Sequence, residues 1–177
     1  MVDTDERQAV SALAEQTRRL DAAGVPWAVV PGVPAYAAAA AELGVELTVP
    51  EVVQSVVLTR TQARSTAMPS AEALENFAAT GATLVLHLAI TRIRELAERL
   101  IPTHGADCPV AVVANASRPH RVELRGTLAD VADAVEAAGL RQAAVILVGR
   151  ALVRPGEAES WLYASSPERE NRRQRKL

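Results

Sequence analysis

The sequence predicts an α/β fold in which a mixed, mostly parallel β-sheet carries helices on both faces. Short runs of valine, leucine and isoleucine alternate along the chain with segments of about ten residues that have helical spacing. Aromatic residues make up only 3% of the chain and hydrophobic residues 49%, so aliphatic side chains and alanine must fill the core. Two apolar runs lie close together around residues 115–120, which predicts one antiparallel hairpin. The length of 177 residues favours a single domain.

Apolar residues recur at helical spacing in five segments. These are residues 6–23, 36–43, 70–79, 92–100 and 127–139. Glycine stands at the end of three of them, at Gly24, Gly44 and Gly139, where its tolerance of positive φ supplies the usual helix stop. Ser70 is expected to cap the third helix, because a serine hydroxyl satisfies the free amide groups of a first turn.

Six apolar runs predict strands. They lie at residues 27–30, 52–59, 83–88, 109–114, 121–124 and 144–148. The first of them is expected to be buried, and the polar stretch 61–69 is expected to be a loop. From Arg154 onward the alternation of apolar runs and helical segments ends, so we expect 154–177 to be a disordered basic tail. A solvated tail is favoured over a nucleic-acid-binding one, since the charges of 168–176 are mixed and no aromatic residues interleave.

Composition excludes several classes of function. A net charge of −2 gives no general attraction to nucleic acid or to an anionic membrane, and scarce aromatics disfavour base stacking. The single cysteine excludes an intramolecular disulfide and any cysteine-based metal cluster. The first seven residues are too charged for a signal peptide, and no run approaches the ~20 apolar residues of a membrane span. We therefore expect a soluble, cytoplasmic protein with no nucleic-acid or membrane partner.

The segment 25–35 is the most informative candidate for a site. A β-rich run breaks at Pro31 and Gly32 and opens directly into an alanine-rich helix. Such a corner sets free backbone N–H groups and the positive end of a helix dipole at a sheet edge, where α/β folds bind ligands. The alternative is a plain strand-to-helix corner, because Pro-Gly is common turn punctuation.

Titratable side chains give weaker signals. The histidines His87, His104 and His120 fall on an expected strand, a loop and a turn, with no pair spaced to share a helix face, so no metal site is predicted. Cys108 stands at the entrance of an apolar strand, which favours a buried, inert thiol over a nucleophile.

Several segments together resemble a known family. In order and spacing they are similar to the later two thirds of the precorrin-4 C11-methyltransferases, a group of tetrapyrrole methylases of the cobalamin pathway. The segments that carry the resemblance are 12–16, 18–20, 25–35, 47–52, 54–60, 108–113, 125–128 and 144–149. They cover about residues 12–151, and no single motif is decisive.

The resemblance implies a fold, an activity and a site. The fold is the C-terminal αβα domain of the class III methylases, over 25–153, preceded by a helix and the remnant of an inter-domain loop over 1–24. The activity is methyl transfer from S-adenosylmethionine to precorrin-4 or cobalt-precorrin-4 by a homodimer, as in this family. The cofactor contacts carried over by position are Pro34, Ala35, Leu88, Ala116 and Ala143, all of them small or apolar.

The resemblance also implies that the chain lacks the family's N-terminal domain, which carries most of the precorrin pocket. Where the family has a Gly-Asp-Pro-Ser loop, this chain has Asp5-Glu6-Arg7-Gln8. Two interpretations of the function therefore stay open. The chain is either a methyltransferase that is truncated and inactive alone, or a non-catalytic cofactor-binding or dimerising module. Arg60 and Arg64 are likewise open between contacts to tetrapyrrole carboxylates and solvation in a loop.

Overall fold

The computed structural model describes residues 13–61 and 68–153. The start of the first expected helix, the 5–8 loop, Arg64 and the tail 154–177 lie outside these residues. Where Ala22 ends the described part of the first helix, Gly24 follows with φ of 64°, as expected for a helix stop. No helix within the described ranges has the length and apolarity needed to cross a membrane.

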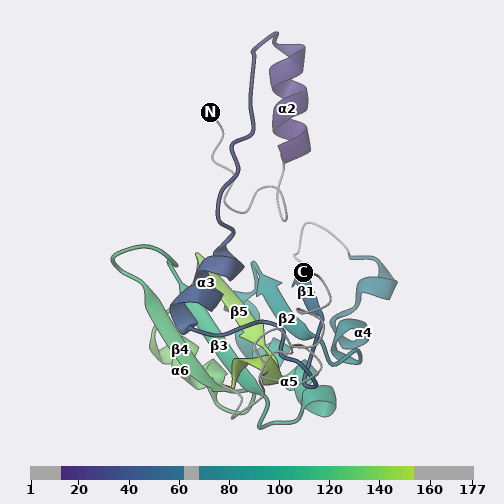
Figure 1. The fold of residues 1–177 in the computed structure, drawn as a ribbon, viewed down its shortest axis with the longest axis vertical. Helices are drawn as coiled ribbons and strands as arrows, with labels where there is room; N and C mark the ends of the chain where they lie inside the picture. Colours follow the sequence, from purple (N-terminus) through teal and green to yellow (C-terminus); the bar gives the residue numbers. More distant parts are fainter. Residues whose placement is uncertain (1–12, 62–67, 154–177) are drawn as a thin grey trace, which may run out of the picture.

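Five strands of the described chain form one sheet, and helices flank it (Figure 1). The strands are β1 (Val56–Arg60), β2 (Thr83–His87), β3 (Pro109–Ala114), β4 (Val122–Thr127) and β5 (Ala144–Val148). The α-helices are α2 (Leu13–Ala22), α3 (Ala35–Leu43), α4 (Leu74–Ala78), α5 (Ile93–His104) and α6 (Val131–Ala137). Short 3₁₀ turns lie at Ser70–Glu72, Ile90–Arg92 and Arg150–Leu152.

The sheet is mixed, with the order β1-β2-β5-β3-β4. Only β1 and β2 pair in parallel, while β5 pairs antiparallel with both β2 and β3, and β3 forms the expected antiparallel hairpin with β4. The prediction of a mostly parallel sheet is therefore wrong, because three of the four strand pairs described here are antiparallel. The antiparallel pairs arise because β5 inserts between β2 and β3. The position of a strand in a sheet depends on distant parts of the chain, so an apolar run does not predict it.

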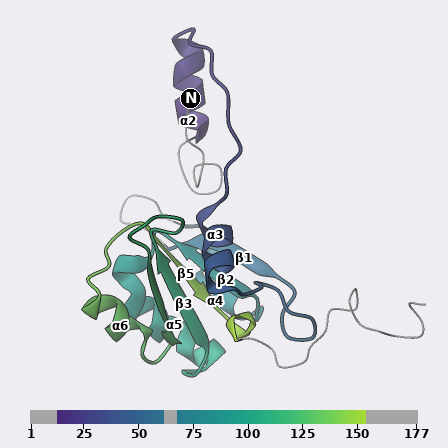
Figure 2. The ribbon, with the colours of Figure 1, turned by 60° about the vertical axis from the view of Figure 1, so that its left-hand side comes forward.

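Helices cover both faces of the sheet, as expected. One face packs against α4, α5 and α6 through a cluster that includes Leu86, Leu96, Val112, Val131 and Ile146. The opposite face packs against α3 through a cluster whose members are Ala39, Leu43, Val85, Ala111, Val113, Val145, Leu147 and Leu152. Figure 2 shows α3 on the face away from α5 and α6. The largest of the fully buried side chains are all aliphatic, as the low aromatic content requires.

Alanine allows α3 to lie close to the sheet. The helix begins after Pro34 and ends at Gly44, whose φ of 63° is left-handed, and Ala39 is completely buried against the sheet. We expect Ala39→Leu to lower the free energy of unfolding by about 1–3 kcal/mol, because extra methylenes have no room there. Ala41→Leu, on the exposed side of the same helix, is the matched control. Equal chemical-denaturation midpoints for the two variants would contradict this packing.

The expected buried strand at 27–30 is wrong. This segment runs beside α2, away from the sheet (Figure 1), and Trp27 is 42% exposed. The Trp27 Nε1 group donates to the Asp21 carboxylate at 2.8 Å, and the Val25 amide donates to the Leu20 carbonyl at 2.9 Å. The segment therefore packs on its own helix, and its valines, although typical of a strand, are not covered by the core.

Several element boundaries also differ from expectation. Strand β1 begins at Val56 rather than at 52, because Val49 and Val53 pair with each other across a tight turn. The helix expected at 70–79 breaks at Ala73, where ψ is 141°, and no side chain caps either part. Strand β4 continues to Thr127, and α6 starts only after Asp130, whose carboxylate accepts from the Thr127 amide at 2.6 Å.

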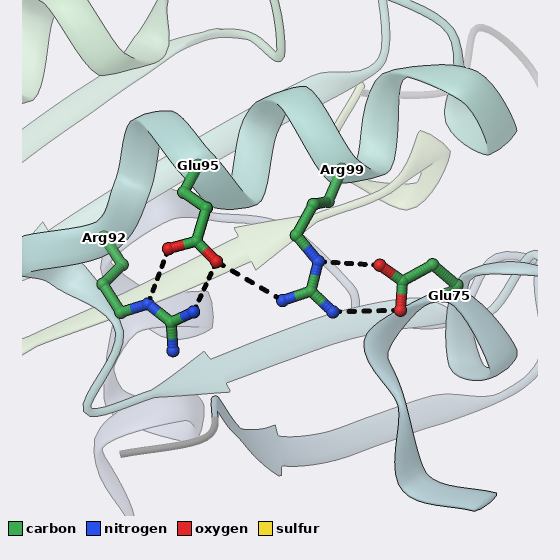
Figure 3. Close-up of polar contacts among 4 residues, drawn as sticks. All are labelled: Glu75, Arg92, Glu95 and Arg99. Atoms are coloured by element: carbon green, nitrogen blue, oxygen red, sulfur yellow. Dashed lines mark hydrogen bonds and ion pairs between the residues drawn. The ribbon is translucent and has the colours of Figure 1, made fainter. Parts of the chain in front are cut away.

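Ion pairs tie the helices of one face together (Figure 3). The Arg99 guanidinium of α5 makes two hydrogen bonds to the Glu75 carboxylate of α4, at 2.7 and 2.9 Å, while Glu95 bonds Arg92 and lies 3.6 Å from Arg99. The hydrogen bonds from Arg99 hold the pKa of Glu75 below its ordinary value. Because these groups are largely solvent-exposed, each pair contributes only about 0–1 kcal/mol.

Candidate functional site

The candidate site is the sheet edge at which β2 and β3 end and β5 begins. Because β5 runs antiparallel to both neighbours, Ala144 pairs with Ala114, and Ile146 pairs with Leu86. The residues just beyond these strands, Leu88, Ala116 and Ala143, therefore gather at one edge. Ligands of open α/β sheets bind at the carboxyl ends of strands, where the strand order changes direction.

The backbone of this edge is strained. Left-handed φ angles occur at Leu88 (55°), Asn115 (54°), Ser117 (61°) and Ala143 (52°). Each such conformation costs a non-glycine residue about 1–3 kcal/mol, and it persists only where the surroundings enforce it, often at functional sites. The Asn115 amide donates to the Ala143 carbonyl at 2.8 Å, so two of the strained residues are joined directly.

The side chains at the edge are small or apolar. Ala143 is exposed, Ala116 is half-buried, and Leu88 is 65% exposed although it directly follows a fully buried strand. A turn alone does not require an exposed leucine side chain or a left-handed backbone at this position. The edge thus offers an apolar contact beside two alanines that allow close approach of a ligand to the backbone.

Helix α3 brings the other two candidate residues to the same face of the sheet. Pro34 is the N-cap, with extended φ and ψ of −69° and 150°, Ala35 is the first helical residue, and no side chain caps this end. Tyr36, the next residue, and Ala116 pack against the same buried cluster. The positive end of the helix dipole and the amides of the first turn therefore lie on the face that carries Ala116.

A further contact was not predicted from the sequence. Oε1 of Glu42, in the last turn of α3, accepts a hydrogen bond from the Ser117 amide at 2.6 Å. Its Oε2 lies 3.6 Å from a guanidinium nitrogen of Arg121, and Arg125 donates to the Leu43 carbonyl at 2.7 Å. The bonded residues Glu42 and Ser117 are 75 positions apart, and no local pattern signals the pairing.

Arg60 ends β1 and is half-buried. It lines a hollow of about 140 Å³ together with Thr61, Met68, Ser70 and Arg99, among others. Because β1 and β2 are parallel and Arg60 pairs with His87, Arg60 lies at the same end of the sheet as Leu88. A role for Arg60 toward substrate carboxylates remains a prediction.

A larger hollow, of about 640 Å³, lies between α5 and α6 and contains none of the five predicted cofactor residues. Its charged walls are engaged with each other: Arg94 bonds Asp133 at 2.6 Å and Glu136 at 2.7 Å. Because the Arg94 guanidinium is already paired with these two carboxylates, it is not available to a ligand, and the sheet edge remains the better candidate.

The three histidines lie on different elements. His87 is buried in β2, His120 is exposed in the β3–β4 hairpin, and His104 ends α5. The described residues contain no group of three or more potential ligands that could hold a metal ion. Cys108 is completely buried, as expected, and burial raises the pKa of its thiol, which disfavours a nucleophilic thiolate.

His104 predicts an acid sensitivity of the fold. Both ring nitrogens are buried without hydrogen-bond partners among the described residues, and burial, followed by the charge of Arg150, lowers the pKa of the imidazole. The unfolded chain therefore binds a proton more readily than the folded one as pH falls below about 6.5, so stability present above that pH is lost. Denaturation series across this range should show a weaker pH dependence for His104→Leu than for the wild-type chain, and an unchanged dependence in a folded His104→Leu variant would contradict this prediction.

Together, the mixed sheet and the helices on both of its faces define an α/β domain. Residues 9–132 match the model of the tetrapyrrole (corrin/porphyrin) methylases, and the chain belongs to this family.

Relatives within the family are similar over most of this chain. A precorrin-4 C(11)-methyltransferase of Rhodococcus erythropolis is 57% identical over 159 residues, which are 90% of this chain and 64% of that protein. A cobalt-precorrin-4 C(11)-methyltransferase of Methanocaldococcus jannaschii is 37% identical, over 98% of this chain and 67% of its own length. The chain thus spans less than two thirds of the Rhodococcus protein.

Solved structures agree on the fold. The X-ray structure of a cobalt precorrin-4 methyltransferase superposes with a TM-score of 0.77 at 36% identity, covering 83% of this chain and 62% of that one. A uroporphyrin-III C-methyltransferase from Thermus thermophilus, complexed with S-adenosyl homocysteine, gives a TM-score of 0.60 at 24% identity, over 78% and 59% of the two chains. These likenesses confirm the methylase α/β domain.

Proposed function

We propose that this chain forms the S-adenosylmethionine-binding part of a precorrin-4 or cobalt-precorrin-4 C11-methyltransferase. The observation that carries the proposal is the strained sheet edge. Two of the five predicted cofactor residues, Leu88 and Ala143, are left-handed themselves, and a third, Ala116, lies between two left-handed residues. Strain of this kind at the carboxyl ends of strands is typical of a preformed ligand site.

The residues at the edge suit the cofactor. When bound, S-adenosylmethionine supplies a methyl group on a sulfonium, which is already a good leaving group. The protein therefore needs no acid or metal for this step and contributes chiefly by holding donor and acceptor in line. Leu88 offers an apolar surface to an adenine or a thioether, while Pro34, Ala35, Ala116 and Ala143 leave room for close approach to the backbone.

The methyl acceptor is inferred from the relatives. The relatives reported above are named for precorrin-4 or its cobalt form. Methyl transfer is tested by incubating the purified chain with labelled S-adenosylmethionine and precorrin-4 and measuring label in the tetrapyrrole. Transfer supports the full activity, whereas binding of S-adenosyl homocysteine without transfer limits this chain to the cofactor half of the reaction.

A second candidate is a non-catalytic cofactor-binding module. It is favoured by the exposed apolar segment 25–33 beside α2, because exposed apolar patches are typical of surfaces that bind another protein. The same experiment separates the two functions: a module binds S-adenosyl homocysteine and shows no transfer even at saturating tetrapyrrole.

The exposed segment also supports self-association as a homodimer. Val25, Trp27, Val30 and Val33 are all exposed large apolar side chains within nine residues of one another. Sedimentation velocity should show a dimer that Trp27→Glu weakens, whereas Val153→Glu, at another exposed apolar position, should leave it intact. A monomeric wild-type chain at all concentrations tested would contradict this expectation.

A further inference from the structure

We infer that Glu42 is a positioning residue that holds the 115–117 turn in the conformation required by the cofactor site. This inference rests on the proposed function, because the turn carries Ala116. Glu42 lies in the last turn of α3, whose first turn carries Pro34 and Ala35. One short helix thus connects the two parts of the site.

The contact itself is specific. The Glu42 side chain is only 16% exposed, and its Oε1 accepts the Ser117 amide at 2.6 Å, a length typical of a charge-assisted hydrogen bond. Its Oε2 is buried and lies 3.6 Å from Arg121, a residue at the other end of the same hairpin loop. The carboxylate therefore contacts residues at both ends of the loop, Ser117 and Arg121.

The location of Glu42 is not explained by helix stability. A carboxylate near the C-terminus of a helix faces the negative end of the dipole, which disfavours it. Arg125 meets the same helix end from β4, donating to the Leu43 carbonyl at 2.7 Å. A glutamate at this unfavourable helix position is better explained by the backbone amide that it binds.

The turn needs such an anchor. Asn115 and Ser117 both adopt left-handed φ, and serine, unlike asparagine, rarely does so without support. The Asn115 amide is bonded to the Ala143 carbonyl. Fixing Ser117 through Glu42 therefore fixes Ala116 and keeps it in register with Ala143, while the rigid helix α3 sets their distance from Ala35.

The first test compares binding of S-adenosyl homocysteine to three variants by calorimetry. Glu42→Ala should raise the dissociation constant about tenfold, the effect of losing one hydrogen bond to a charged group. Glu42→Gln should stay within about threefold of wild type, because its amide oxygen still accepts from Ser117. Glu46→Ala, an exposed carboxylate just beyond α3, should bind as wild type does. Thermal melting of each variant confirms that it is folded.

The second test reads the turn without ligand. Amide hydrogen exchange of Ser117, followed by nuclear magnetic resonance, should accelerate about tenfold or more in Glu42→Ala and remain slow in Glu42→Gln. Unchanged exchange in folded Glu42→Ala, or unchanged affinity of that variant, would overturn the inference. If the wild-type chain does not bind S-adenosyl homocysteine, the proposed function fails, and the exchange rates alone decide whether Glu42 holds the turn.

Discussion

Ala35→Trp should abolish measurable binding of S-adenosyl homocysteine, raising the dissociation constant at least about 100-fold, which corresponds to about 2.7 kcal/mol. Ala35 is the first residue of α3, at the helix end that carries no side-chain cap. An indole there would fill the space over which a ligand approaches the helix amides. Calorimetric titration of the purified variant, with the wild-type chain alongside, measures the effect.

The control for this prediction is Ala41→Trp, which places the same indole on the exposed side of the same helix. It should bind as wild type does, since the Ala41 side chain is exposed rather than packed against the sheet. Equal affinities for Ala35→Trp and wild type, with both proteins folded by circular dichroism, would exclude the α3 N-terminus from the site.

Gly149→Ala should lower the free energy of unfolding by about 2–5 kcal/mol, the sum expected from backbone strain and overpacking. Gly149 is buried at the end of β5 with φ of 148°, a conformation that side chains rarely adopt. A Cβ atom would lie 3.2 Å from Thr83 Cα and 3.4 Å from Thr83 Oγ1. That hydroxyl donates to the Leu47 carbonyl at 2.8 Å, so a shift of Thr83 would also disturb the hydrogen bond to Leu47, outside the sheet.

Gly139→Ala separates strain from crowding. Gly139 also has positive φ, 65°, but nothing lies within 4 Å of a Cβ placed there. Gly139→Ala should lower the free energy of unfolding by about 1 kcal/mol, because only the backbone conformation is unfavourable for alanine there. Similar losses for the two variants in urea denaturation would show that the contact with Thr83 is not as tight as the structure indicates.

The core elements were predictable because their signals are local. Strands β3 and β5 coincide with the expected runs 109–114 and 144–148, where apolar residues are continuous and Asn115 or Gly149 follows. The helix stops at Gly44 and Gly139 were likewise expected, since a left-handed C-terminal residue is a property of a few consecutive residues.

The failures have non-local causes. The valines of 27–30 have strand propensity, yet burial depends on a covering surface that propensity does not specify. The antiparallel insertion of β5 depends on the path of α6 across the sheet. The bond between Glu42 and Ser117 joins elements that only the complete fold brings together.

The five predicted cofactor residues came from the family resemblance and not from any pattern in their own chemistry. Alanine, proline and leucine at such positions are indistinguishable from packing residues in a sequence. The structure adds an independent observation, since it places Leu88, Ala116 and Ala143 together at a strained edge. Backbone strain of this kind is visible only in coordinates.

The most direct test of the site is a nuclear magnetic resonance titration of the ¹⁵N-labelled chain with S-adenosyl homocysteine. The account predicts that the largest shifts occur at the amides of Leu88, Ala116 and Ala143 and in the first turn of α3. Shifts concentrated instead in the hollow between α5 and α6, around Arg94 and Leu140, would contradict it, as would a folded chain that shows no shifts at saturating ligand.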